Sequence, residues 1–318
     1  MLSEIDLDAA AARLTGVVRR TPVLRSRLLD ERVGAEVHLK AEHLQRTGAF
    51  KFRGAFNAIA ALPSSVRQKG IISYSSGNHA QAVARAAQLF GVPAVIVMPS
   101  DAPRSKRTAT ESYGAEIISY DRYTQRRENI AAKVVQDRNL TLIPPFDHPD
   151  VIAGQSTCTQ ELFEDSGPLD QLIVSVGGGG LISGSALAAH RENASCEIVG
   201  IEPDSGNDVQ LSLREGRIIE IDVPETIADG QQTTAPGTHT FAVMQQHVAE
   251  IATVSDSQIL DAMDYLFRFQ NQVVEPSGAS ALAALLSGAI KPVGNRIGVI
   301  LSGGNISPEK FVELMGSR

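Results

Sequence analysis

The chain has 318 residues, of which 43% are hydrophobic and 20% charged, and its formal net charge is -7. The length suggests two domains or one large domain, and the mild acidic excess without a basic run argues against a nucleic-acid partner. Two cysteines, Cys158 and Cys196, exclude a disulfide framework. No apolar run is long enough to span a bilayer, and the acidic N-terminal segment does not resemble a signal peptide. We therefore expect a cytoplasmic protein with no membrane partner.

Apolar runs alternate with helical patterns along most of the chain. We predict strands at 36–42, 70–75, 93–98, 115–120, 140–144, 171–176, 197–201 and 296–301. Predicted helices include 79–90, 103–113, 126–137, 181–190 and a segment that begins with a capping box at Ser255 and Gln258. Most of the strands are continuously apolar, which is typical of parallel strands that are buried on both faces. The alternation predicts an α/β fold with parallel sheets flanked by helices.

One segment indicates how the chain is divided into domains. Residues 147–156 combine turn-forming residues with the beginning of a new helix. We interpret this segment as a crossing between domains. Residues 1–69 and 148–318 would then form a large domain, and residues 70–147 a small α/β domain.

Four consecutive glycines separate a predicted buried strand from a predicted helix; they are Gly177, Gly178, Gly179 and Gly180. We expect no packing role for them. Glycines at a helix N-terminus allow backbone N–H groups to approach an anion, which the helix dipole also favours. The sequence therefore predicts a phosphate-binding loop.

The same loop leaves a second interpretation open. A strand, a glycine loop, a helix and a strand followed by Glu202 resemble half of a dinucleotide-binding fold. The GxGxxG spacing is not met, because Ser183 occupies the third glycine position after Gly178 and Gly180. A glycine loop alone does not exclude a nicotinamide-dependent oxidoreductase or a non-catalytic binding domain.

Two further polar stretches follow predicted strands. Ser75, Ser76, Asn78 and His79 offer hydroxyl, amide and imidazole groups at one strand end, which is where α/β folds bind ligands. A helix N-cap would explain one of these residues but not the group. The second stretch, LSGGN at 301–305, would be an ordinary turn if it stood alone.

Lys51 lies between Phe50 and Phe52, directly after a Thr-Gly turn. Most lysines are simply exposed, but an amine held among apolar groups has a lowered pKa and becomes a usable nucleophile. Such an amine condenses with an aldehyde. Pyridoxal phosphate carries an aldehyde and a phosphate, so this cofactor explains both the lysine and the glycine loop. A nicotinamide cofactor would explain only the loop.

Four motifs now identify a resemblance. TGAFKFRGA at 47–55, SSGNHAQ at 75–81, VGGGG at 176–180 and LSGGN at 301–305 occur in the order found in fold-type II pyridoxal-phosphate enzymes, the tryptophan synthase β-like group. Further motifs resemble those of serine racemases and serine/threonine dehydratases; they are RTPVL at 20–24, PETIADG at 224–230 and VEPSGA at 274–279. The resemblance implies a two-domain enzyme that forms a homodimer.

The resemblance also implies roles in cofactor binding. Lys51 would hold the cofactor covalently and remove the substrate Cα proton, and Phe50 would pack under the pyridine ring. Asn78 would donate to the ring hydroxyl, and Ser302 would face the ring nitrogen. The phosphate would bind to Gly177, Gly178, Gly179 and Gly180.

The substrate contacts follow from the same resemblance. Ser76 would be the second acid/base, on the substrate face opposite Lys51. Ser75, Asn78 and His79 would join Ser76 in holding the α-carboxylate. Arg127 would be placed to bind a second carboxylate, although a surface arginine on a helix is an equally good interpretation.

The residue types allow two reactions. A serine at the ring nitrogen makes the cofactor a weak electron sink, which favours prompt loss of a β-hydroxyl and release of a 2-oxo acid and ammonia. We predict a dehydratase, or ammonia-lyase, for serine, threonine or 3-hydroxyaspartate. The alternatives are an ammonia-lyase specific for 3-hydroxyaspartate and, if Ser76 returns a proton from the far face, serine racemase.

A metal site is also implied. Glu202, Asp208 and the carbonyl of Gly206 resemble the divalent-cation site of serine racemases and related dehydratases. Such hard oxygen ligands suit Mg²⁺, Ca²⁺ or Mn²⁺. A solvated acidic loop is the alternative, and a cation here would be structural.

Overall fold

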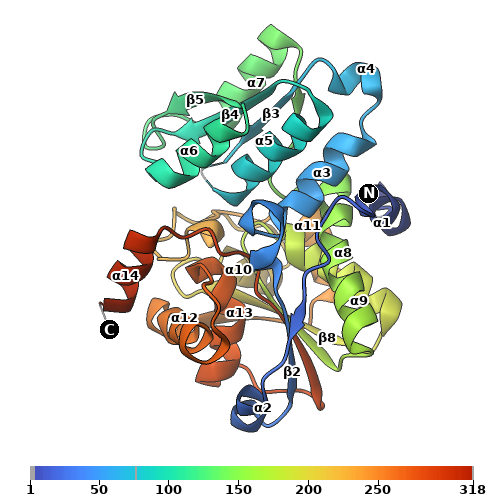
Figure 1. Cartoon of the computed structure of the whole chain (residues 1–318), viewed down its shortest axis with the longest axis vertical. Helices are drawn as coiled ribbons and strands as arrows, with labels where there is room; N and C mark the ends of the chain where they lie inside the picture. The colour runs from blue at the N-terminus through green and yellow to red at the C-terminus, as the bar shows by residue number, and fades with distance from the viewer. Residues whose placement is uncertain (1–3, 76, 317–318) are drawn as a thin grey trace.

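The computed structural model describes residues 4–75 and 77–316, and it contains two sheets, one in each lobe of the molecule (Figure 1). The six-stranded sheet has the order β1-β2-β10-β7-β8-β9. Its strands are β1 (Val23–Leu24), β2 (Glu36–Lys40), β7 (Gln171–Ser175), β8 (Glu197–Pro203), β9 (Glu250–Val254) and β10 (Arg296–Ile300). The four-stranded sheet has the order β5-β4-β3-β6. Its strands are β3 (Ile71–Tyr74), β4 (Ala94–Pro99), β5 (Glu116–Tyr120) and β6 (Thr141–Leu142).

The predicted strands are confirmed, and so is the α/β class. Among the strand pairs of the described residues, all are parallel except β1 with β2, where Val23 is paired with Lys40. Two strands, β1 and β9, were not predicted. β1 has only two residues, too few for a recognisable pattern, and two of the five residues of β9 are polar.

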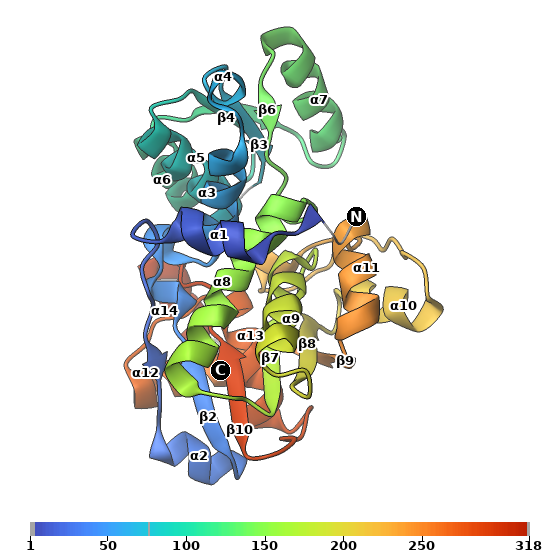
Figure 2. The ribbon, with the colours of Figure 1, turned by 90° about the vertical axis from the view of Figure 1, so that its right-hand side faces the viewer.

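Helices cover both faces of each sheet (Figures 1 and 2). Helices before β7 are α1 (Leu7–Leu14), α2 (Arg27–Val33), α3 (Lys51–Ala61), α4 (Ser64–Arg67), α5 (Asn78–Phe90), α6 (Arg104–Ser112), α7 (Arg127–Arg138) and α8 (Pro149–Ser166). Those after β7 are α9 (Gly180–Glu192), α10 (Asp208–Glu215), α11 (Thr238–His247), α12 (Asp256–Gln270), α13 (Pro276–Ser287) and α14 (Pro308–Gly316). Short 3-10 turns are η2 (Glu42–Leu44), η3 (Arg46–Gly48) and η4 (Asp229–Gln231). No helix of the described chain has the length and apolar character of a membrane span.

Alternate residues of the central strands face separate cores, as expected for sheets covered on both sides. Ile173 of β7 packs in the cluster that includes α12 and α13, whereas its neighbour Leu172 packs against α8 and α9. In the four-stranded sheet, Ile71 faces α3 and α5, and Ile72 faces α7. Both sheets are therefore buried layers, which explains their continuously apolar strands.

Helix α3 lies at the junction of the two sheets. Its residues Phe52 and Phe56 share a core cluster with Ile71 of β3, and the helix also packs against α8. The segment predicted to cross between domains is the beginning of α8, which starts at Pro149. We therefore keep the division into 1–69 with 148–318 and 70–147 as a proposal, with α3 at the boundary.

A buried cluster of charged side chains anchors α3 through Arg53. The Arg53 side chain is completely buried and donates to Glu42 at 2.8 Å and to Glu161 at 2.7 Å. Lys40, also fully buried, donates to Glu161 at 2.8 Å. Because a buried charge is tolerated only with such partners, this network fixes Arg53 and therefore Lys51 two residues earlier.

Candidate active site

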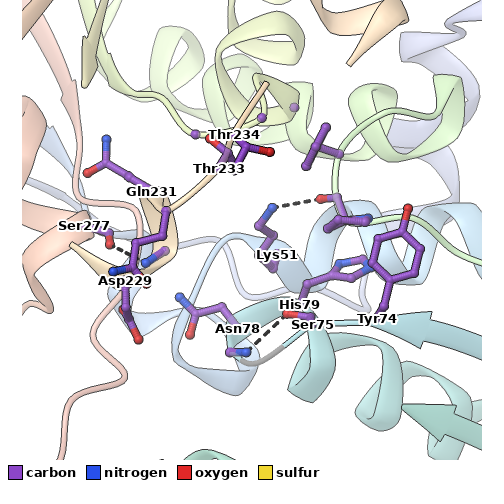
Figure 3. Close-up of a pocket in the computed structure, with 18 of the residues that line it drawn as sticks. Lys51, Tyr74, Ser75, Asn78, His79, Asp229, Gln231, Thr233, Thr234 and Ser277 are labelled. Atoms are coloured by element: carbon purple, nitrogen blue, oxygen red, sulfur yellow. Dashed lines mark hydrogen bonds between the residues drawn. The ribbon is translucent and has the colours of Figure 1, made fainter. Parts of the chain in front are cut away.

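A cavity of about 310 Å³ opens between the two sheets, at the carboxyl ends of their strands. Ser75 after β3, Ser175 at the end of β7 and Ser302 after β10 all line it. Helix α3 supplies Lys51, whose side chain lies near the centre of the close-up in Figure 3. The structure thus brings together the lysine, the SSGNH loop, the glycine loop and the LSGGN turn. These motifs are far apart in the sequence, and the ligand position is the one expected for α/β folds.

Lys51 is the first residue of α3. It follows a turn in which Thr47 adopts a left-handed conformation, with φ of 58°. The Lys51 Nζ atom donates a 2.8 Å hydrogen bond to the carbonyl oxygen of Pro145, and it lies 5.1 Å from the centre of the Phe50 ring. Burial lowers the pKa of Lys51 to about 8. At pH 7 about a tenth of this amine is therefore neutral, far more than for an ordinary lysine, and the neutral form is the nucleophile.

The glycine loop forms the N-terminus of α9, which has no side-chain cap. The first N–H groups of a helix have no intrahelical partner, so the loop is suited to an anion. The expectation that these glycines have no packing role is wrong. A Cβ atom at Gly178 would lie 2.3 Å from the Phe146 ring, and one at Gly179 would lie 2.8 Å from Met244. Packing therefore also requires glycine, and the phosphate role stays a prediction.

The loop before α5 places three of its predicted residues on the cavity wall. The Ser75 hydroxyl accepts a 3.2 Å hydrogen bond from the Gly77 N–H. His79 Nε2 lies 3.1 Å from the Ile143 carbonyl, and burial, together with the charge of Lys51, lowers the pKa of His79 to about 3. His79 is therefore neutral, and because the Ile143 carbonyl can only accept, Nε2 carries the single ring proton and Nδ1 is an acceptor. Only the backbone N–H of His79 can donate to a carboxylate. Ser76 lies outside the described residues.

Asn78 and Ser302 also line the cavity. The Asn78 amide is bonded at both ends, as donor to Glu275 and as acceptor from Asn305. Ser302 is buried, and its hydroxyl lies 3.4 Å from the carbonyl oxygen of Ser277, which it can donate to. These positions are compatible with the predicted contacts to a ring hydroxyl and a ring nitrogen, which remain predictions.

Arg127 also lines the cavity and is the first residue of α7. Its guanidinium lies 5.1 Å from the centre of the Tyr74 ring, and its Nε atom donates to Glu128 at 2.8 Å. The neighbouring Arg126 lines the same cavity and has no ion pair within the described residues. The predicted Arg127 guanidinium is thus present at the cavity, and the structure adds a second guanidinium, that of Arg126.

Several residues of the site were not predicted. Pro145 and Phe146 face Lys51 and the glycine loop from the segment after β6, and Lys106 and Asp229 pair across the cavity. The PETIADG and VEPSGA motifs contain Asp229 and Glu275, but a motif alone assigns no role to them. Pro145, Phe146 and Lys106 carry no signal in the sequence.

The residues predicted to bind metal lie outside this cavity. Glu202 and Asp208 are both completely buried, and Glu202 accepts from the backbone N–H groups of Val209 at 3.0 Å and Gln210 at 2.9 Å. Burial and the adjacent acid raise the pKa of Glu202, and burial raises the pKa of Asp208 to about 7. The described residues contain no cluster of three or more His, Cys, Asp or Glu side chains suited to a metal. The predicted set of two carboxylates and the Gly206 carbonyl stays a prediction.

A buried amine, a helix N-terminus built from glycine and three serines at strand ends define the site of a fold-type II pyridoxal-phosphate enzyme. The comparisons agree. The family model for pyridoxal-phosphate dependent enzymes matches residues 14–303, so the chain belongs to that family. The nicotinamide alternative and the non-catalytic alternative are thereby set aside.

Three named relatives are similar to the chain over nearly its whole length. The chain is 48% identical to an L-threo-3-hydroxyaspartate ammonia-lyase from Pseudomonas sp., over 98% of this chain and 97% of that protein. It is 46% identical to a serine racemase from Schizosaccharomyces pombe, over 98% of this chain and 96% of that protein. The solved structure of maize serine racemase superposes with a TM-score of 0.93 at 40% identity, covering 98% of this chain and 97% of that one.

Proposed function

We propose that this protein is a pyridoxal-phosphate dependent ammonia-lyase that removes water and then ammonia from 3-hydroxyaspartate. The observation that carries the proposal is the buried Lys51 amine, with its pKa lowered to about 8, in one cavity with the glycine loop. The relatives at 48% and 49% identity are L-threo-3-hydroxyaspartate ammonia-lyases, which favours this substrate over serine or threonine. Serine racemase is the second candidate, because a relative at 46% carries that activity.

The residues present fit the cofactor. When bound, pyridoxal phosphate would withdraw electrons from the substrate Cα. Lys51 would attach the cofactor and then take the Cα proton on its Nζ atom. We further propose, as the family pattern implies, that the phosphate rests on the N–H groups of Gly177, Gly178, Gly179 and Gly180, with Phe50, Asn78 and Ser302 against the ring.

Substrate orientation would come from the loop before α5 and from α7. Ser75 would hold the α-carboxylate with its hydroxyl, and Asn78 and His79 would hold it with their backbone N–H groups at the beginning of α5. Ser76 would be the acid/base on the other face. Arg127 would bind the distal carboxylate. Its ring contact with Tyr74 holds the guanidinium on the cavity wall, although the bond to Glu128 uses one of its donors. Arg126 has no such acidic partner in the described chain and would add a second positive charge.

The metal and the homodimer are parts of the same proposal. A divalent cation at Glu202, Asp208 and the Gly206 carbonyl would remove the cost of burying two carboxylates side by side. Among the described residues, neither oxygen of the buried Asp208 carboxyl has a hydrogen-bond partner. Dimerisation would cover large exposed apolar side chains, among them Leu44 and Val273, which are brought close by a 2.7 Å contact between His43 and Gln272.

The experiment is an assay of 2-oxo acid and ammonia release with serine, threonine and the four isomers of 3-hydroxyaspartate. We expect one threo isomer of 3-hydroxyaspartate to be turned over with the highest kcat/KM. Interconversion of D- and L-serine without ammonia release would instead establish the racemase. If the purified protein neither binds pyridoxal phosphate nor shows an absorption band in the near-visible region, the whole proposal is wrong.

A further inference from the structure

The Asn78 amide is held in one orientation by a chain of hydrogen bonds. The carbonyl oxygen of Thr47 can only accept, and it receives a 2.7 Å bond from Asn305 Nδ2. The same nitrogen donates to Asn78 Oδ1 at 2.8 Å. At its other end, Asn78 Nδ2 donates to Glu275 Oε1 at 2.5 Å. Because an ionised carboxylate is acceptor-only, the bonds on both sides specify which end of the Asn78 amide carries the N–H groups.

Glu275 is built into the fold at this point. It precedes α13 as its N-cap residue, and only 2% of it is exposed. A Cβ atom at Gly303 would lie 2.1 Å from Glu275 Oε1, so the LSGGN turn must have glycine there for the carboxylate to fit. The other oxygen, Oε2, has no hydrogen-bond partner within the part of the chain that the structure describes, and the residue lines the cavity. A buried carboxylate with so few partners is costly unless charge nearby compensates it.

The compensating charge comes from the other side of the cavity. Lys106, on α6, is nine-tenths buried and pairs with Asp229 of η4. It also lies close to Gly77, where a Cβ atom would be 3.6 Å from Lys106 Nζ. Burial lowers the pKa of Lys106, but Asp229 and Glu275 outweigh this and raise it, so the ammonium stays charged. Lys106 is thus a cation that α6, in the four-stranded lobe, contributes to the cavity, where it pairs with Asp229 of η4.

The charges around Glu275 act in opposite directions. Burial raises the pKa of Glu275, the positive charge of Lys106 lowers it and Asp229 raises it, and together these effects give a pKa of about 7. Loss of Lys106 would therefore leave Glu275 largely protonated at neutral pH. A protonated carboxyl carries a donor as well as an acceptor, and it no longer dictates the orientation of Asn78.

We propose that Glu275 is a positioning residue that holds the Asn78 amide with an N–H directed at the cofactor ring, and that Lys106 favours the accepting, ionised form of Glu275. The inference rests on the proposed function, because it assumes that Asn78 donates to the ring oxygen. In this arrangement the second N–H of Asn78 Nδ2 is free for that bond, since only one is used by Glu275.

The test titrates the apoprotein with pyridoxal phosphate and records the near-visible absorption band. We expect Glu275→Leu to weaken cofactor binding at least about tenfold, the loss of one hydrogen bond to a charged group, and to shift the band. Glu275→Gln keeps an acceptor but allows both amide orientations, so it should weaken cofactor binding less than Glu275→Leu does. It also carries the test if Glu275→Leu does not fold.

Lys106 is tested by its pH dependence. We expect Lys106→Met to resemble Glu275→Gln at pH 7 and to approach the wild type at pH 9, where Glu275 ionises without help. Lys106→Arg should restore wild-type binding. Lys133→Met, a change of an exposed lysine on α7, is the matched control and should have no effect.

The outcomes are separable from those of the proposed function. A wild-type protein that binds no pyridoxal phosphate would remove the proposed function. A wild-type protein that binds it, together with folded Glu275→Gln and Glu275→Leu variants of unchanged affinity and band position, would overturn the inference alone. Equal effects of Lys106→Met at pH 7 and pH 9 would overturn the role of Lys106.

Discussion

The Nζ atom of Lys51 donates a 2.8 Å hydrogen bond to the carbonyl oxygen of Pro145, a residue of the segment that leads from β6 back to the six-stranded lobe. The bond joins the first turn of α3 to the wall that also carries Phe146, and Phe146 packs against the glycine loop. The amine is therefore held in place between the predicted phosphate loop and the loop before α5. A nucleophile positioned in this way loses little freedom when it reacts.

Replacement of the lysine tests the central assignment. We expect Lys51→Ala to abolish the near-visible absorption band and to reduce ammonia release at least about a hundredfold, because the variant lacks the amine that attaches the cofactor and moves the Cα proton. Lys69→Ala, at an exposed position before β3, is the control and should retain both. Retention of the band in Lys51→Ala would show that another amine holds the cofactor.

The pKa of His79 gives a prediction for acid stability. The folded value is about 3 and the ordinary value is 6.5, so the unfolded chain binds a proton at His79 between these pH values and the folded chain does not. The contribution of His79 to the free energy of unfolding is complete above pH 6.5 and falls as the pH is lowered towards 3. Between pH 6.5 and pH 5 the wild type should lose roughly 2 kcal/mol that His79→Asn does not lose. Urea unfolding of both proteins over this range measures the difference, and parallel curves would contradict it.

Arg127 gives a prediction about specificity. If its guanidinium binds the distal carboxylate, Arg127→Ala should lower kcat/KM for 3-hydroxyaspartate about 10- to 100-fold, the loss of a charge-assisted hydrogen bond, with little change for serine. Arg126→Ala measures how much Arg126 contributes to binding of the distal carboxylate. Arg138→Ala, at the exposed far end of α7, serves as the control. Equal losses with both substrates would rule out a distal-carboxylate role for either arginine.

Removal of the predicted cation should destabilise the fold rather than the chemistry. An ion held at a hundred times its dissociation constant adds about 2.7 kcal/mol to the free energy of unfolding, so a chelator should lower the Tm by several degrees. Asp208→Asn should lower the affinity for Mg²⁺ or Mn²⁺ in a calorimetric titration, whereas Asp204→Asn, at an exposed neighbour, should not. If neither chelator nor added metal changes the Tm, no cation binds here. Glu202 and Asp208 are then a buried acid pair in which Glu202 accepts from the first N–H groups of α10.

The strands could be predicted because each sheet is covered on both faces, which requires nearly every residue of a central strand to be apolar. Ile71 and Ile72 belong to different cores, and so do Leu172 and Ile173. Local chemistry likewise revealed Lys51 between aromatics and four glycines before a helix. These signals are local in sequence, and they were enough to indicate the cofactor class.

The sequence by itself determined the α/β class and indicated Lys51, the glycine loop and the other loops as candidate site elements, because these signals depend on neighbours a few residues away. Only the tertiary structure decided that the Pro145 carbonyl accepts a hydrogen bond from the Lys51 amine and that the Phe146 ring leaves room only for glycine at Gly178. It also decided that Lys106 pairs with Asp229, 123 positions further along the chain. It also decided that Asn78 is oriented by Glu275, 197 positions away. Contacts of this kind form only when two lobes close on one cavity, and burial there, rather than residue type, sets the pKa values of Lys51 and His79.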